Sequence, residues 1–258
     1  MRRRLGQSLR LGVGAGAVAL VQARRWGGAP LALLAEHPYE GSAGLAQALD
    51  AVLEPAYAGW PLTIVLADDL VRLWQVTPPP QASRLADLEA AAALRFQLLY
   101  GEPAAGWTLR AGWDLDRPFL AAALPRALQA SIEQGARRHR LVETVPQFVV
   151  NFNRWCGALK PGAWYGQLHD RVLTLGAIDA GALVAVRAQA LPDGADAAWL
   201  AQHLAREALR LNLAVPERLQ LCGSVPPGWL GAACARLGAA APAGWSAAAL
   251  LAASGSAA

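Results

Sequence analysis

Apolar side chains recur at every second position near the N-terminus, in two segments separated by small residues. The alternation runs over 9–13 and again over 18–22, and positions 14–16 between them are Gly, Ala and Gly. A period of two is typical of a strand with one buried face, and glycine allows the positive φ angles that tight turns often need. With a further short strand expected at 31–34, the pattern predicts an antiparallel meander that keeps 8–23 in the mature fold.

Further along the chain, the apolar period changes between two and about 3.6 residues, which separates predicted strands from predicted helices. Ser83 is expected to cap a helix in which Leu88, Ala92 and Phe96 share one face, and Asp196 is expected to cap another. The predicted helices are 40–52, 83–99, one that Pro125 opens, 146–155, 196–211, 229–237 and an Ala-rich helix from 246. The predicted strands are 62–66, 71–76, 119–124, 141–145, 164–168, 172–178, 183–190 and 219–222.

The predicted elements follow the same order twice. A three-stranded meander followed by alternating helices and strands begins near the N-terminus and again near residue 163. Such a repeat is typical of a duplicated α/β fold rather than of a plain doubly wound sheet, and 258 residues suffice for two compact lobes. We therefore expect a first lobe over 1–160 and a second, shortened lobe over 161–258.

Three segments resemble those of the actin-like, ribonuclease-H-like ATPase superfamily. The superfamily's first phosphate-loop hairpin is similar to LGVGAGAVALV at 11–21. The strand before its helix and turn is similar to FLAAALP at 119–125, and its adenosine-motif strand is similar to LQLCGS at 219–224. Together with the order of elements, these segments resemble the branch that contains PilM-type proteins and the cytoplasmic domains of GspL-type and MshI-type secretion and pilus proteins. The resemblance implies a duplicated ribonuclease-H-like fold and a vestigial nucleotide site at Gly14, Gly16 and Gly223.

In active members of the superfamily, a D-x-G-type turn in each hairpin holds Mg²⁺ and the nucleotide phosphates, because the metal neutralises phosphate charge. The matching position in the first hairpin is Val13, and the second loop is matched to WYGQ at 164–167. Neither loop then has its acid, so we expect a pseudo-ATPase with no catalytic residues, no bound metal and at most weak phosphate contact with glycine amides. The alternative is an active ATPase or sugar-kinase relative that uses Asp50, Asp68 or Asp179.

Composition and charge argue against several other classes of protein. With 55% hydrophobic and 16% charged residues, the chain is not expected to be disordered. The net charge of +4 comes without the dense basic face that nucleic-acid binding needs. Cys156, Cys222 and Cys234 form no CxxC pair, and no two histidines have metal-ligand spacing. Asp68 and Asp69 directly follow a predicted strand and are expected to cap a turn or helix rather than to act in acid–base catalysis.

The N-terminus has a second interpretation. Arg2 to Arg4 and the apolar stretch 11–23 are similar to a secretory signal peptide, and removal of residues 1–23 would leave an exported binding protein. Glycines interrupt the stretch, and Arg24 and Arg25 would directly follow the cut. The stretch is also shorter than the about 20 apolar residues that span a bilayer. We therefore favour the strand interpretation and a cytoplasmic protein.

The resemblance also implies a function and a partner. It implies a cytoplasmic scaffold of a type IV pilus or type II secretion inner-membrane platform, which receives a short cytoplasmic segment of a bitopic inner-membrane protein in a groove on the first lobe. Association with the membrane would then be peripheral and through the partner. The sequence does not locate that groove. One or more Trp or Arg anchors are expected, because these side chains dominate binding hot spots. For any single one of the ten tryptophans core packing is the favoured role, and the basic run RRHR at 137–140 is favoured as a solvated helix end, with partner or acidic-lipid contact as its alternative.

Overall fold

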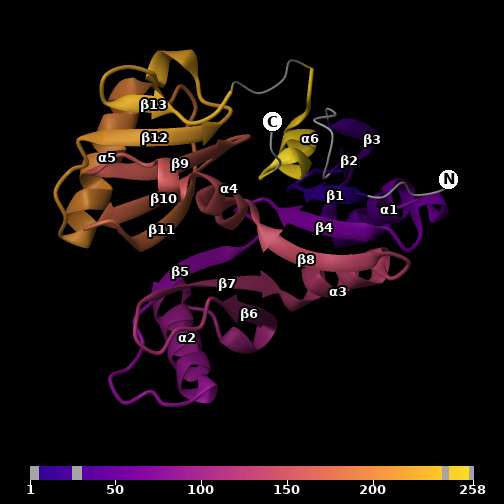
Figure 1. The fold of residues 1–258 in the computed structure, drawn as a ribbon, viewed down its shortest axis with the longest axis horizontal. Helices are drawn as coiled ribbons and strands as arrows, with labels where there is room; N and C mark the ends of the chain where they lie inside the picture. The colour runs from indigo at the N-terminus through magenta and orange to yellow at the C-terminus, as the bar shows by residue number, and fades with distance from the viewer. Residues whose placement is uncertain (1–5, 25–30, 240–243, 256–258) are drawn as a thin grey trace. The chain divides into compact units, whose positions relative to one another are not determined.

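The computed structural model describes residues 6–24, 31–239 and 244–255, which pack as two compact units. Unit 1 takes its residues from 1–71, 124–150 and 242–258, and unit 2 takes its residues from 72–123 and 151–241. Figure 1 shows the elements of each unit. No helix among the described residues is both long and apolar enough to span a membrane.

Unit 1 is built on a five-stranded sheet of order β3-β2-β1-β4-β8 (Figure 1). Its strands are β1 (Gln7–Val13), β2 (Ala17–Arg24), β3 (Ala32–Pro38), β4 (Pro61–Leu66) and β8 (Arg140–Pro146). The first three strands are antiparallel neighbours, whereas β4 runs parallel to β1 and β8 runs parallel to β4. The predicted meander is therefore confirmed, with a third strand that is longer than expected.

The described residues of unit 1 form three complete α-helices, namely α1 (Gly41–Val52), α3 (Arg126–Ala136) and α6 (Ala247–Ala253). Helix α6 packs on β1 and β2, and this close approach explains Gly12, because a Cβ there would lie 2.6 Å from the backbone nitrogen of Ala252. Ser246 caps α6 as a hydrogen-bond acceptor from the backbone N–H of Ala249, at 3.1 Å. Helix α4 (Gln147–Trp155) begins in unit 1 and continues into unit 2.

Unit 2 contains a second five-stranded sheet, of order β11-β10-β9-β12-β13. Its strands are β9 (Ala163–His169), β10 (Val172–Asp179), β11 (Ala182–Ala190), β12 (Arg218–Gly223) and β13 (Cys234–Arg236). Again three antiparallel strands are followed by two parallel ones, so the topology of the first sheet is repeated. The repeat confirms the predicted duplicated α/β fold. The exact division into lobes 1–160 and 161–258 stays a prediction, although each sheet falls within one of them.

The C-terminal part of unit 2 corrects one predicted helix. Residues 229–237 do not form a helix: a short 3-10 helix ends at Trp229, and Cys234–Arg236 form β13 alongside β12. Glycines at 228 and 231 weaken any helix there, whereas the edge of β12 offers backbone hydrogen bonds to a passing strand. The neighbouring helix α5 (Ala197–Leu211) is confirmed, with Asp196 accepting from the N–H of Trp199 at 2.8 Å.

A smaller α/β part of unit 2 consists of a three-stranded sheet and helix α2 (Leu85–Tyr100). The sheet order is β5-β7-β6, with β5 (Arg72–Val76), β7 (Phe119–Pro125) and the unpredicted β6 (Trp107–Ala111). The cap of α2 differs from the prediction by one residue, because Arg84 rather than Ser83 occupies the cap position. Four 3-10 helices complete the described residues, at Pro55–Tyr57, Ala104–Gly106, Cys156–Ala158 and Pro227–Trp229.

Candidate functional site

The glycine turn between β1 and β2 was predicted as a phosphate loop, but its backbone groups form hydrogen bonds within the protein. The N–H of Gly14 donates to the carbonyl of Ala17 at 3.0 Å, and the carbonyl of Gly16 accepts from the N–H of Tyr39 at 2.9 Å. The hydroxyl of Tyr39 donates to the carbonyl of Gly14. Contrary to expectation, neither glycine has a positive φ. A side chain at Gly16 would meet no atom within 4 Å, so neither torsion angles nor packing demand glycine there.

The residues of this turn do not fit a magnesium–nucleotide site. Val13 is apolar and fully buried, so it offers no ligand to a metal, and the N–H of Gly14 is already used. Burial raises the pKa of the Tyr39 hydroxyl, and the nearby carboxylate of Asp69 adds to that rise. Asp69 is exposed and follows β4, so it is the acid to examine if nucleotide binding is found.

The acids considered for an active enzyme are engaged or placed elsewhere. Asp68 is buried and accepts from the N–H of Phe148 at 2.9 Å, at the start of α4, which confirms its predicted capping role. Asp50 is exposed on α1. Asp179 ends β10, at the opposite end of that strand from the β9–β10 turn.

The second predicted phosphate loop is not at 164–167. Gly166 lies inside β9, where its missing side chain makes room for Leu221, and the turn that joins β9 to β10 is Asp170–Arg171. This turn does contain an exposed acid, Asp170, with a φ of 51°. The matching of 164–167 failed because the strand extends further than its apolar pattern indicated. Residues 167 and 169 are polar but buried.

Gly223, the third predicted nucleotide residue, lies in unit 2 and has a structural reason to be glycine. Its φ is 90°, and a Cβ there would lie 3.0 Å from the carbonyl carbon of Leu168 and closer still to its oxygen. That oxygen accepts from the N–H of Ser224 at 2.9 Å. Gly14 and Gly16 lie together in unit 1, whereas Gly223 ends a strand of unit 2. Their assignment to one nucleotide site stays a prediction.

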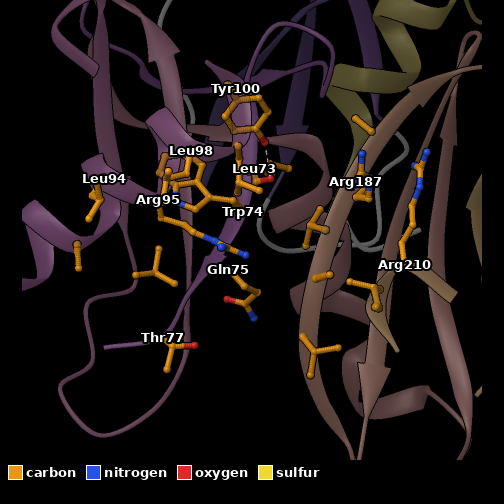
Figure 2. Close-up of a pocket in the computed structure, with 18 residues that line it drawn as sticks. Leu73, Trp74, Gln75, Thr77, Leu94, Arg95, Leu98, Tyr100, Arg187 and Arg210 are labelled. Carbon is orange, nitrogen blue, oxygen red and sulfur yellow. Dashed lines mark hydrogen bonds between the residues drawn. The ribbon is translucent and has the colours of Figure 1, made fainter. Parts of the chain in front are cut away.

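A groove of about 720 Å³ lies within unit 2, between α2 and the edge strands β5 and β11 (Figure 2). β5 contributes its base and α2 one wall, while β11 and the last turn of α5 form the other wall. The side chain of Gln75 joins the two sheets, because its amide donates to the carbonyl of Leu183 on β11. The residues that line the groove include Leu73, Trp74, Leu94, Arg95, Leu98, Arg187 and Arg210. The sequence patterns did not indicate this groove.

An aromatic cluster fixes α2 over β5 and thereby shapes the groove. The ring of Phe96 lies 5.3 Å from that of Trp74 and 5.1 Å from that of Tyr100. The hydroxyl of Tyr100 donates to the carbonyl of Leu73 at 2.9 Å (Figure 2). Burial raises the pKa of this hydroxyl, although the positive charges of Arg72 and Arg187 oppose the rise. The wall formed by α2 is therefore packed on β5 and not merely adjacent to it.

A buried carboxylate orients two of the arginines in the groove. Glu207 of α5 is only 3% exposed. One of its oxygens lies 2.8 Å from Nη1 of Arg210, and the other lies 3.2 Å from Nε of Arg187. Both arginine side chains remain more than half exposed, so their charge faces solvent. The ion pairs keep a buried acid neutralised and hold two cations beside the groove.

The comparisons with known proteins identify the fold. No protein-family model and no curated protein matches the chain. A Bacteroides thetaiotaomicron protein described as having an actin-like ATPase fold and unknown function superimposes with a TM-score of 0.60, at 11% identity, over 86% of this chain and 84% of that one. The chain has an actin-like ATPase fold. The duplicated sheet topology described above is the physical basis of that likeness.

Two further structures with a similar fold come from secretion and pilus assemblies. The cytoplasmic domain of EpsL, an inner-membrane component of the type II secretion system of Vibrio cholerae, matches with a TM-score of 0.56 and 12% identity, over 95% of this chain and 92% of that one. A chain of the PilM–PilN type IV pilus biogenesis complex matches with a TM-score of 0.59 and 19% identity, over 91% of this chain and 89% of that one. At these identities the likeness concerns the actin-like fold.

The lowered pKa values of two buried histidines predict how the stability of the protein depends on pH. Burial lowers the pKa of His203, which stacks on Trp199 with ring centroids 5.0 Å apart, and the carboxylate of Glu207 only partly offsets this. Burial and the charge of Arg138 lower the pKa of His139. Because the unfolded chain then binds protons more readily than the folded one, the free energy of unfolding should decrease as pH falls below about 6.5.

Urea denaturation at pH 7.5 and at pH 5.5 measures this effect. The double variant His139→Gln and His203→Gln should show a smaller decrease between the two pH values than the parent chain. The partly exposed His37→Gln is the matched control and should leave the decrease unchanged. If the free energy of unfolding decreased equally in the parent chain and the double variant, these two histidines would not be the cause of the loss of stability at low pH.

Proposed function

We propose that this chain is a cytoplasmic, actin-like scaffold of a type IV pilus or type II secretion inner-membrane assembly. In this function it holds the cytoplasmic segment of a bitopic membrane protein, associates peripherally with the membrane through that partner, and does not hydrolyse ATP. The observation that carries the proposal is the likeness, over more than nine-tenths of the chain, to the cytoplasmic domain of EpsL and to the PilM–PilN structure.

The chemistry of the glycine turn supports a scaffold rather than an ATPase. Phosphoryl transfer depends on a metal ion and on backbone N–H groups that point at the phosphates. Here the residue expected to hold the metal is Val13, and the N–H of Gly14 is committed to Ala17. A protein that keeps the fold but not this chemistry retains surfaces for binding, and a cytoplasmic peptide needs only such a surface.

Peptide binding and ATP turnover, measured on the same preparation, test this proposal. N-terminal cytoplasmic peptides of bitopic inner-membrane proteins encoded nearby are labelled and titrated with the full chain. We expect one of them to bind with a Kd of about 1–100 μM, or roughly −8 to −5.5 kcal/mol, and ATP turnover with Mg²⁺ to stay at the level of buffer. Steady turnover, with no peptide bound more tightly than millimolar, would support the ATPase alternative instead. N-terminal sequencing accompanies the test, because material beginning at Arg24 would support the exported alternative.

A further inference from the structure

The groove of unit 2 is open and partly apolar. Leu94 and Leu98 lie one turn apart on α2 and are 60% and 70% exposed, yet both line the groove (Figure 2). Exposed leucines that gather at a hollow mark a surface for a macromolecule, whereas small-molecule sites enclose most of their ligand. The groove is therefore better suited to a protein segment than to a metabolite.

The side chains that line the groove carry positive charge. Arg95, Arg187 and Arg210 line the groove, and no Asp or Glu is among its lining residues. Glu207 neutralises part of the charge of Arg187 and Arg210 from its buried position, while no acid pairs with Arg95 in the described part of the chain. Charge complementarity selects partners and speeds their encounter. The complementary segment carries carboxylates.

The base of the groove contains two buried polar atoms that make no hydrogen bond to the described residues. Oε1 of Gln75 and Nε1 of Trp74 are buried and have no hydrogen-bond partner among the described residues. β5 and β11 are the edge strands of their sheets, and the amide of Gln75 on β5 donates to the carbonyl of Leu183 on β11. Unpaired buried polar groups cost free energy, and the main chain of an extended segment can supply both a donor and an acceptor.

The length of the wall sets the size of the segment. The residues of α2 that line the groove run from Ala91 to Tyr100, which corresponds to about 14 Å at about 1.5 Å per residue. An extended chain advances about 3.3 Å per residue, so about four residues lie against this wall. The leucines and arginines on the walls then contact alternate side chains of the segment.

We propose that this groove binds an extended protein segment in which acidic and apolar side chains are combined, and that the segment belongs to a partner other than the membrane protein. Cytoplasmic segments next to a membrane span are enriched in Lys and Arg, and the arginines of the groove repel such a segment. The assignment of the groove to an acidic segment rests on the groove alone, and only the exclusion of the membrane protein rests on the proposed function.

Selection from a library of random decapeptides, using the full chain as target, tests the inference. Selected peptides are labelled and their affinity is measured by fluorescence polarisation for the parent chain and for the double variant Arg95→Glu and Leu98→Ser. The matched control is Arg206→Glu and Leu209→Ser, which changes an exposed arginine and an exposed leucine of α5 outside the groove. Circular dichroism verifies that each variant is folded, and Leu98→Ser alone replaces the double variant if it is not.

We expect the selected peptides to contain at least two acids among apolar residues. They should bind the groove variant at least tenfold more weakly than the parent chain, and the control variant within twofold of it. The inference is overturned if no peptide is enriched, if the selected peptides are basic or uncharged, or if the groove variant binds as well as the parent. Competition by a basic cytoplasmic peptide of the membrane partner for the same groove would also overturn it.

Discussion

Phe96→Ala should lower the free energy of unfolding by about 3–5 kcal/mol, the usual cost of truncating a fully buried aromatic ring. The ring of Phe96 has no exposed surface and contacts Trp74, Tyr100 and Trp107, with ring centroids 5.1–5.3 Å apart. Removing it leaves a cavity between α2 and β5 that these rigid rings cannot fill. Urea denaturation followed by tryptophan fluorescence and circular dichroism measures the loss.

The matched control for this prediction is Leu98→Ala, two residues further along the same helix. Leu98 is 70% exposed, so its truncation should change stability by no more than about 0.5 kcal/mol. The two variants should separate folding from binding, since Leu98 lines the groove without supporting the core. A cost below about 1 kcal/mol for Phe96→Ala would mean that α2 is not fixed over β5 as described.

Gly223→Ala should destabilise the protein by about 2–5 kcal/mol. A left-handed backbone costs a residue with a Cβ about 1–2 kcal/mol, and forcing an extra methyl into a packed site adds about 1–3 kcal/mol. Both penalties apply here, because φ is 90° and the new Cβ would meet the carbonyl group of Leu168. The shift in urea midpoint, at unchanged slope, measures the effect.

Gly16→Ala is the control for Gly223→Ala, and the pair distinguishes structural from ligand-binding glycines. Gly16 has no positive φ and no atom within 4 Å of a new Cβ, so its replacement should be neutral or stabilise by up to about 1 kcal/mol. If Gly223→Ala proved as stable as the parent chain but bound ATP more weakly, the predicted nucleotide role of Gly223 would gain support over the structural one.

Local patterns predicted the elements whose stability depends on their own residues and nearest neighbours. The alternation over 9–13 and 18–22 predicted β1 and β2 correctly, because a two-residue period places Leu9, Leu11 and Val13 on one buried face of β1. In β2, residues 18–21 are all buried, so both faces of that strand are covered. The cap of α5 was equally visible, since Asp196 acts on an N–H group three residues away. The helix from 246 was also predicted, whereas its cap, Ser246, was not. By contrast, β6 and β13 were missed or mistaken, because each is a strand only through the neighbour that it pairs with.

The candidate sites also divide into features that the local sequence indicated and features that depend on tertiary contacts. The sequence alone drew attention to the glycine turn and to the order of elements, which sufficed for the actin-like fold. It could not show that the N–H of Gly14 is used within the turn, or that Gly12 and Gly223 are glycines because another backbone passes close by. The approaches to Gly12 and Gly223 join residues that are distant along the chain, whereas the bond of Gly14 depends on the exact conformation of the turn.

The groove was decided by tertiary structure throughout. Leu94, Arg95 and Leu98 come from α2, whereas Arg187 comes from β11 and Arg210 from α5, about a hundred residues later in the chain. In the sequence, each of these residues is an ordinary exposed position on a helix or strand. They form one surface only because the packing of Phe96 fixes α2 on β5, and because Glu207 orients two arginines from the other side.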